Sequence, residues 1–161
     1  MDIKFQVQTK IQKPVAEVFD AVYDPDKLSG YFTNGGAKGK LDEGTTVEWA
    51  FADTPGEEEI RFPVTVRQMV KNELIVLDWQ SRTDGGNTRV EMKFEADGPN
   101  ATIVRIAESG WDETPDDLAR SYGNCMGWSQ MVSALKAYTE YGINLRRGAY
   151  EGLYSKKDHE K

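Results

Sequence analysis

Few side chains in this chain are suited to catalysis or metal binding. His159 is the single histidine and lies in a charged stretch near the C-terminus, where no preorganised site is expected to hold it. Cys125 is the single cysteine, so no internal disulfide can form, and we expect it to be a small core residue on a helix. A metal site built from histidine and cysteine is therefore not expected. A site of carboxylates alone stays open, although "DGGN" and "DEG" are better explained as turns. No glycine-rich nucleotide motif precedes a helix, and we expect no cofactor.

Glu108 is the ionisable side chain that the sequence directs into the interior. Alternation along residues 102–109 turns Glu108 to the same side as Val104 and Ile106. A carboxylate among apolar neighbours is costly unless a partner or water satisfies it, and such groups are enriched in functional pockets. In the simpler alternative, the end of the strand opens to solvent. The candidate partners of this carboxylate are Arg89, Arg105, Ser121 and Tyr122.

Large apolar side chains provide the other candidate site. The four tryptophans, Trp49, Trp79, Trp111 and Trp128, come from the predicted sheet and its last helix, and each needs a partner for its N–H when it is buried. They either fill a solid core or line a cavity for a flat or hydrophobic molecule. The sequence leaves both open, because a core and a cavity wall have the same residue composition. The predicted ligand site consists of Trp49, Leu77, Trp79, Met92, Phe94, Ile106, Glu108, Tyr122, Met126 and Trp128.

Strands and short helices position these residues. Apolar and polar residues alternate along residues 3–11, which predicts a strand with one solvent-exposed face. Pro14 suits the start of a helix with an apolar stripe over residues 15–22, and "DPDKLSGYF" predicts a second short helix. Between residues 35 and 111, glycine-rich and aspartate-rich turns separate short apolar runs, which predicts an antiparallel meander. Pro63 indicates a bend or an edge position, and "ADTPGEEE" an exposed acidic loop. We expect strands at residues 37–41, 46–51, 60–70, 74–81, 88–96 and 102–109.

The last helix is expected to be the longest. Thr114 can cap it, Pro115 fits its first position, and Gly142 can end it after Tyr141. The stretch "SYGNCMGWSQ" places Gly123 and Gly127 inside this helix, where each costs about 1 kcal/mol relative to alanine. They either allow another backbone to approach, loosen the helix above a pocket, or are merely tolerated. We favour the second interpretation.

Charge and composition narrow the class of protein. The chain has 161 residues and a net charge of −7, which opposes binding to nucleic acid. No run is long and apolar enough for a membrane span, and the N-terminus does not resemble a signal peptide, so we expect a cytoplasmic protein. We predict one α+β domain over residues 1–147, followed by a polar, flexible tail over residues 148–161. The predicted sheet has one apolar face that must be buried, so we expect it to curl around the last helix.

The order of the motifs resembles a known family. "KPVAEVFDAVYDPDKLSGYF", "NELIVLDW", "ESGW" and "GWSQMVSALKAYTEY" occur in the order found in the homologues of the heat-shock-protein-90 ATPase activator, which belong to the START-like, birch-pollen-allergen-like superfamily. The resemblance implies a helix-grip fold: a curved antiparallel sheet of about six or seven strands around a long C-terminal helix, with two short helices after the first strand. It also implies an elongated cavity that holds lipids or aromatic compounds, and, in eukaryotic activators, contact with a chaperone. Where related sequences often carry a histidine before the Ser-Gly-aromatic turn, this chain has Glu108.

Three functions follow as hypotheses. The first is non-enzymatic binding of a small hydrophobic or aromatic ligand between sheet and helix. The second is a protein-interaction role, with a chaperone or a second copy of the chain as partner. The third is a cyclase-like or hydrolase-like enzyme with Glu108 as general base. We favour the first. The third has the least support, because Glu108 is the one candidate group and no orienting triad accompanies it in the sequence.

Overall fold

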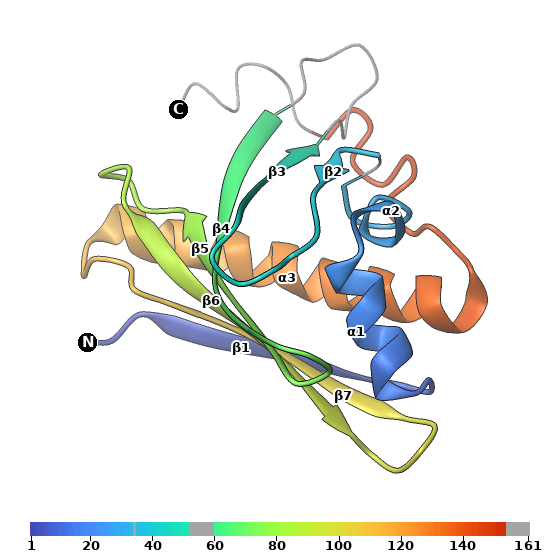
Figure 1. Cartoon of the computed structure of the whole chain (residues 1–161). Helices are drawn as coiled ribbons and strands as arrows, with labels where there is room; N and C mark the ends of the chain where they lie inside the picture. The colour runs from blue at the N-terminus through green and yellow to red at the C-terminus, as the bar shows by residue number, and fades with distance from the viewer. Residues whose placement is uncertain (34, 52–59, 154–161) are drawn as a thin grey trace.

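The computed structural model describes residues 1–33, 35–51 and 60–153, which form a curved antiparallel sheet with a long helix across one face (Figure 1). Seven strands make up the sheet, in the order β1-β7-β6-β5-β4-β3-β2. This arrangement confirms the predicted helix-grip fold. The elements along the chain are β1 (Lys4–Ile11), α1 (Val15–Tyr23), α2 (Pro25–Leu28), β2 (Ala37–Lys38), β3 (Thr46–Phe51), β4 (Ile60–Val70), β5 (Leu74–Gln80), β6 (Asn87–Ala96), β7 (Thr102–Ser109) and α3 (Pro115–Tyr141).

The strand bounds agree with the predicted ones to within one residue, except at the end of β2. β2 ends at Lys38 instead of residue 41, and Gly39 takes a positive φ of 89°, a conformation that glycine adopts without strain. β4 is not an edge strand, because it lies between β3 and β5. Pro63 is tolerated there because β4 pairs with β5 only from Thr65 onward, so the proline lies on a locally open edge.

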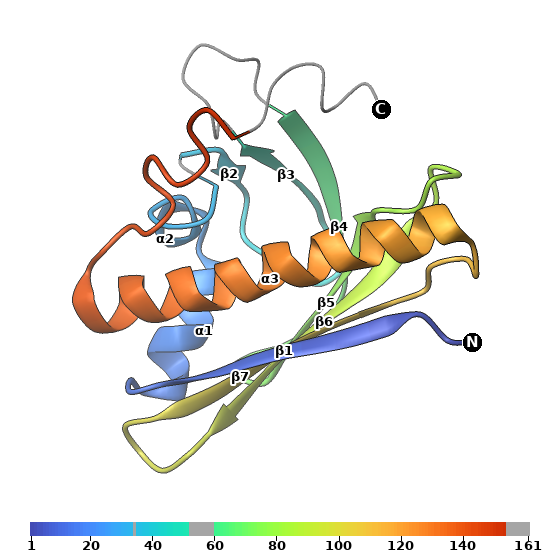
Figure 2. The same cartoon turned by 180° about the vertical axis from the view of Figure 1, so that it is seen from behind.

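The caps of α3 are those expected from the sequence. The side chain of Thr114 accepts a hydrogen bond from the backbone N–H of Asp117, and Pro115 occupies the first turn. Gly142 ends the helix with a left-handed φ of 67°. Figure 2 shows α3 running along the sheet, with α1 beside it. The helix is continuous through Gly123 and Gly127.

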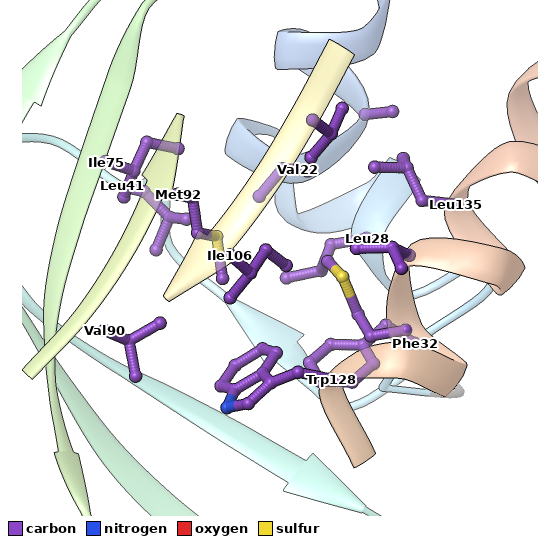
Figure 3. Packing of buried hydrophobic residues seen from close by; sticks show 14 of the residues in the cluster. Val22, Leu28, Phe32, Leu41, Ile75, Val90, Met92, Ile106, Trp128 and Leu135 are labelled. Atoms are coloured by element: carbon purple, nitrogen blue, oxygen red, sulfur yellow. The ribbon is translucent and has the colours of Figure 1, made fainter. Parts of the chain in front are cut away.

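Apolar side chains from the sheet and all three helices meet in one core (Figure 3). Alternate residues of β6 and β7 enter it, as the period-two pattern predicts, and α3 contributes Trp128, Met131, Val132 and Leu135. Much of the space between helix and sheet is thus filled with side chains. Cys125 is a free thiol, half-buried and packed against this core.

The chain beyond α3 returns to the body of the protein. Tyr150, which falls in the predicted tail, is buried, and its hydroxyl donates to Oε1 of Gln130 on α3 at 2.5 Å. The predicted acidic loop and His159 lie outside the described residues. None of the helices formed by the described residues is long and apolar enough to cross a membrane.

Candidate functional site

Glu108 lies near the end of β7, the strand next to the edge strand β1. It faces Val90 of β6 on one side and Phe5 of β1 on the other. Its side chain is fully buried, together with Val104 and Ile106 of the same strand. The inward orientation expected from alternation is therefore confirmed, and the alternative of a strand end open to solvent is wrong.

Uncharged side-chain donors satisfy the buried carboxylate. Oε1 accepts from Thr88 Oγ1 at 2.6 Å and from Asn124 Nδ2 at 3.0 Å, while Oε2 accepts from Trp128 Nε1 at 2.9 Å. Asn124 and Trp128 come from α3, so this network ties the helix to the sheet. Burial raises the pKa of Glu108 above its ordinary value, and the hydrogen bonds from Thr88, Asn124, Trp128 and Ser81 oppose that rise.

None of the partners expected for Glu108 bonds to it. Arg105 pairs with Glu95 and Arg89 pairs with Glu91. Ser121 donates to the carbonyl oxygen of Leu118, and the side chain of Tyr122 is 66% exposed. Those expectations are wrong because the arginines follow the other face of their strands. The carboxylate is met instead by neutral donors, which satisfy its oxygens without a buried countercharge.

A second cluster fixes the start of α3 against the β5–β6 loop. The buried carboxylate of Asp117 accepts from the backbone N–H and hydroxyl of Thr83, at 2.9 and 2.8 Å, and from the backbone N–H of Asp112 at 2.8 Å. These hydrogen bonds lower the pKa of Asp117, and the one from the backbone N–H of Thr83 has the largest effect. Arg120 donates to the carbonyl oxygen of Ser81. Ser81 is thereby held where its hydroxyl accepts from Asn124 at 2.6 Å.

Aromatic rings surround the end of this network. Trp128 packs against Trp79 with ring centroids 5.4 Å apart, and against Phe32 at 5.9 Å. Figure 3 shows Trp128 and Phe32 side by side. Trp49 packs behind Trp79 at 5.7 Å, and Phe51 lies 5.1 Å from Phe32. The N–H of Trp128 has its expected partner, whereas the buried Nε1 atoms of Trp49 and Trp111 have none among the described residues.

A pocket of about 150 Å³ opens beside these rings, at the side of α3. An enclosed apolar cavity of about this volume holds a benzene-sized guest, whereas this pocket is open to solvent on one side. Its walls come from α3, the sheet, the segment after α2 and the segment that follows α3. The lining residues are Phe32, Phe51, Trp79, Gly123, Asn124, Gly127, Trp128 and Arg146.

The two helical glycines border this pocket. A Cβ atom added at Gly123 or Gly127 would meet no atom within 4 Å, so neither glycine is required by the approach of another backbone. For the described residues of this chain, that alternative is wrong. Side chains at these two positions would instead project into open space next to the rings. The pocket is thus accessible because α3 carries no side chains there.

The structure brings only part of the predicted ligand site together. Trp79 and Trp128 line the pocket, while Glu108 and Trp49 lie behind them. Tyr122 and Met126 are 66% and 50% exposed, so their expected place in the interior is wrong. Four residues of the predicted site are buried in the core and do not line this pocket: Leu77, Met92, Phe94 and Ile106.

Sequence reasoning missed the remaining walls of the pocket. Phe32, Phe51 and Arg146 are far from α3 in the sequence, and nothing in their local pattern indicates that they meet. Larger hollows lie at the other end of the molecule, and one of about 500 Å³ separates α1 from the turn between β4 and β5. Its rim includes Asp20, which pairs with Lys27, and the exposed side chains of Glu17 and Lys71. The aromatic pocket has the more apolar set of walls.

Comparison with protein families identifies the family of this chain. Residues 12–140 match the family model described as "Activator of Hsp90 ATPase homolog 1-like protein". The chain belongs to this family. The match covers both helices after β1, the whole meander and nearly all of α3, so Glu108 and all the pocket residues except Arg146 fall inside the family region. Comparison with curated proteins gives no match.

Solved structures share the fold of this activator homologue. The protein SSP2350 from Staphylococcus saprophyticus has a TM-score of 0.73 and 23% identity, over 89% of this chain and 96% of its own. The Aha1 dimer from Colwellia psychrerythraea has a TM-score of 0.69 and 22% identity, over 88% of this chain and 99% of its own. DynU16, from the dynemicin biosynthetic locus, has a TM-score of 0.72 and 22% identity, over 88% of this chain and 49% of its own.

Proposed function

We propose that this activator homologue binds a small, flat aromatic or hydrophobic molecule in the pocket beside α3. The observation that carries the proposal is the set of four aromatic side chains, Phe32, Phe51, Trp79 and Trp128, around a space of about 150 Å³. Ligand pockets are typically lined by apolar and aromatic side chains with a few placed polar groups. Asn124 and Arg146 are the polar groups here.

Apolar burial supplies the affinity in this proposal. Burial of about 100 Å² of ring surface contributes about 2.5 kcal/mol. Offset or edge-to-face contacts with the indole rings add about 0.5–1.5 kcal/mol for each pair. These magnitudes support weak to moderate binding of a single ring system, with the rest of a larger ligand extending out of the open side of the pocket.

Glu108 acts as a positioning residue in this proposal. Its two oxygens accept from Thr88, Asn124 and Trp128, and the side chain is fully buried. A general base needs to reach the proton that it abstracts, and these donors occupy the oxygens. The same hydrogen bonds hold Trp128 and Asn124 in fixed orientations at the pocket wall. This arrangement favours a binding role over catalysis by Glu108.

The proposal is tested with 2-naphthamide as a neutral aromatic probe. Wild type should bind it saturably, seen as a change in tryptophan fluorescence and a rise in Tm. Gly127→Leu should abolish the effect, because Gly127 lines the pocket and a Cβ there meets no atom within 4 Å, so we expect the larger side chain to fill part of the pocket. Ser129→Leu is the matched control, since Ser129 is exposed on the same helix and does not line the pocket. Absence of saturable binding to wild type, or equal binding to Gly127→Leu, would contradict the proposal.

A second candidate function is self-association through the outer face of α3. Tyr122 and Met126 lie one helical turn apart and expose 66% and 50% of their surface. The similar protein from Colwellia psychrerythraea was solved as a dimer. Sedimentation of wild type beside the double variant Tyr122→Ser, Met126→Ser tests the idea. A monomer at every concentration would remove this candidate without affecting the pocket.

A further inference from the structure

We infer that Arg146 determines the size of the ring system that the pocket accepts: its side chain lies over two of the aromatic walls and restricts the site to compact aromatic molecules. The inference rests on the proposed function and adds the size class of the ligand. Arg146 lines the pocket together with Phe32 and Phe51. The region matched by the family model ends at residue 140, so this restriction comes from a part of the chain outside that region.

The guanidinium of Arg146 lies where a ligand ring would stack. Its central carbon is 5.3 Å from the ring centroid of Phe32 and 5.6 Å from that of Phe51. Paired aromatic rings have centroids about 4.5–7 Å apart, so the guanidinium lies within the range that a stacked ligand ring would need. A ring and the guanidinium cannot occupy the same place. Arg146 therefore withholds this part of the two phenylalanine surfaces from a ligand.

The other neighbours of Phe32 belong to the sheet and to α3. Its ring centroid lies 5.7 Å from that of Trp49, 5.1 Å from that of Phe51 and 5.9 Å from that of Trp128. Together with Arg146, these rings leave Phe32 only 5% exposed. A shorter side chain in place of Arg146 would therefore uncover apolar ring surface next to the pocket.

The segment after α3, residues 142–153, holds Arg146 in this position. Figures 1 and 2 show the segment turning back beside α2 toward the end of the sheet that carries β2 and β3. The guanidinium carbon lies 4.7 Å from the ring centroid of Tyr150, which is buried and donates its hydroxyl to Gln130 on α3. Asn144 Oδ1 accepts from the backbone N–H of Arg146 at 3.0 Å. Arg146 thus forms a wall of the pocket that is anchored on both sides in the sequence.

The wall formed by α3 is different. Gly123 and Gly127 line the pocket there, and a Cβ atom at either position would meet no atom within 4 Å. The pocket is thus unobstructed where α3 carries glycine and covered where Arg146 lies over the phenylalanines. Its volume of about 150 Å³ suits one ring. A longer ring system places its additional ring in solvent, where that ring adds little affinity.

The bulk of the Arg146 side chain, and not its charge, sets the limit in this inference. Methionine is unbranched and flexible, so Arg146→Met keeps an apolar chain over the two rings and removes the charge. Arg146→Ala removes both the chain and the charge. Neutral probes of different length therefore separate the two contributions.

The experiment compares 2-naphthamide with anthracene-2-carboxamide, a neutral probe with one more fused ring, by titration of tryptophan fluorescence. Wild type should bind the longer probe no more tightly than the shorter one. In Arg146→Ala the longer probe should bind about 10-fold more tightly than the shorter one, because its additional ring gains contact with Phe32 and Phe51. Arg146→Met should keep the wild-type ratio. Arg147→Ala is the matched control with the same change in net charge, because the exposed Arg147 does not line the pocket.

The outcomes separate this inference from the proposed function. If 2-naphthamide binds saturably but the ratio is the same in Arg146→Ala and wild type, the size limit is overturned and the binding function stands. Equal changes in Arg146→Ala and Arg146→Met would assign the effect to charge and also overturn the inference. Arg146→Val, a milder truncation, should give an intermediate ratio and decides the test if the alanine variant does not fold. Failure of both probes to bind wild type removes the proposed function itself.

Discussion

Replacement of Gly123 and Gly127 by alanine should stabilise the protein and weaken ligand binding at the same time. Both glycines lie inside α3, and an added Cβ would meet no atom within 4 Å at either position. Alanine is favoured over glycine in a helix by about 1 kcal/mol. The double variant should therefore gain about 1–2 kcal/mol in free energy of unfolding, which corresponds to a rise of roughly 2–8 °C in Tm for a chain of this size.

Gly123 and Gly127 line the pocket, so we expect the same two methyl groups to narrow it. A change of one methylene-sized group in an apolar pocket alters affinity by about 10-fold or more, so 2-naphthamide should bind at least about 10-fold more weakly. Thermal unfolding and fluorescence titration measure the two effects on one sample. Ser129→Ala, an exposed site on the same helix, should leave the affinity unchanged. A stabilised double variant that binds 2-naphthamide as tightly as wild type would refute the idea that the two glycines keep the pocket open. A destabilised double variant would refute the statement that the added Cβ atoms meet no other atom.

Three further changes test the polar and aromatic contacts. The folded-state pKa of Glu108 is raised above its ordinary value of 4.5. The stability that this group contributes is therefore fully present below pH 4.5 and declines as the pH rises through the raised pKa. Urea unfolding at a series of pH values should show this decline in wild type but not in Glu108→Gln. Trp128→Phe should lower the free energy of unfolding by about 1–3 kcal/mol more than Trp49→Phe, measured by denaturant titration, because only the former removes a donor from buried Glu108. The pKa of Asp117 is lowered in the folded state, so the stability it supplies is lost as the pH falls through that pKa; in thermal melts, Asp117→Asn should cost more at pH 7 than in acid.

The fold was predictable because its local signals agree with one another. Alternation in β6 and β7 gave the buried face of the sheet, including Glu108, and the cap at Thr114 and Pro115 gave the start of α3. The end of a strand was less predictable where the backbone conformation of a single residue sets it. The positive φ of Gly39 follows the end of β2, which lies three residues earlier than the sequence pattern indicates.

The site was predictable only in part, for geometric reasons. Trp79 and Trp128 were assigned correctly to the interior because each belongs to a periodic apolar pattern. Met126 is two residues before Trp128, about 200° away around the helix, and Tyr122 is about 240° away, so the helical period itself places both on the outer side. The hydrogen bonds of Glu108 to Asn124 and Thr88 depend on how α3 lies across the sheet, which no local pattern specifies.

The walls of the pocket come from distant parts of the chain: Phe32 lies ahead of β2, Trp79 lies in the middle of the meander, and Arg146 lies beyond α3. The binding surface consequently exists only after the first and last thirds of the polypeptide have docked. A guest would be released by any partial unfolding that detaches either end, so its occupancy would be thermodynamically linked to cooperative folding of the entire molecule. Proteolysis of saturated protein should then slow down at sites throughout the chain, including those remote from α3.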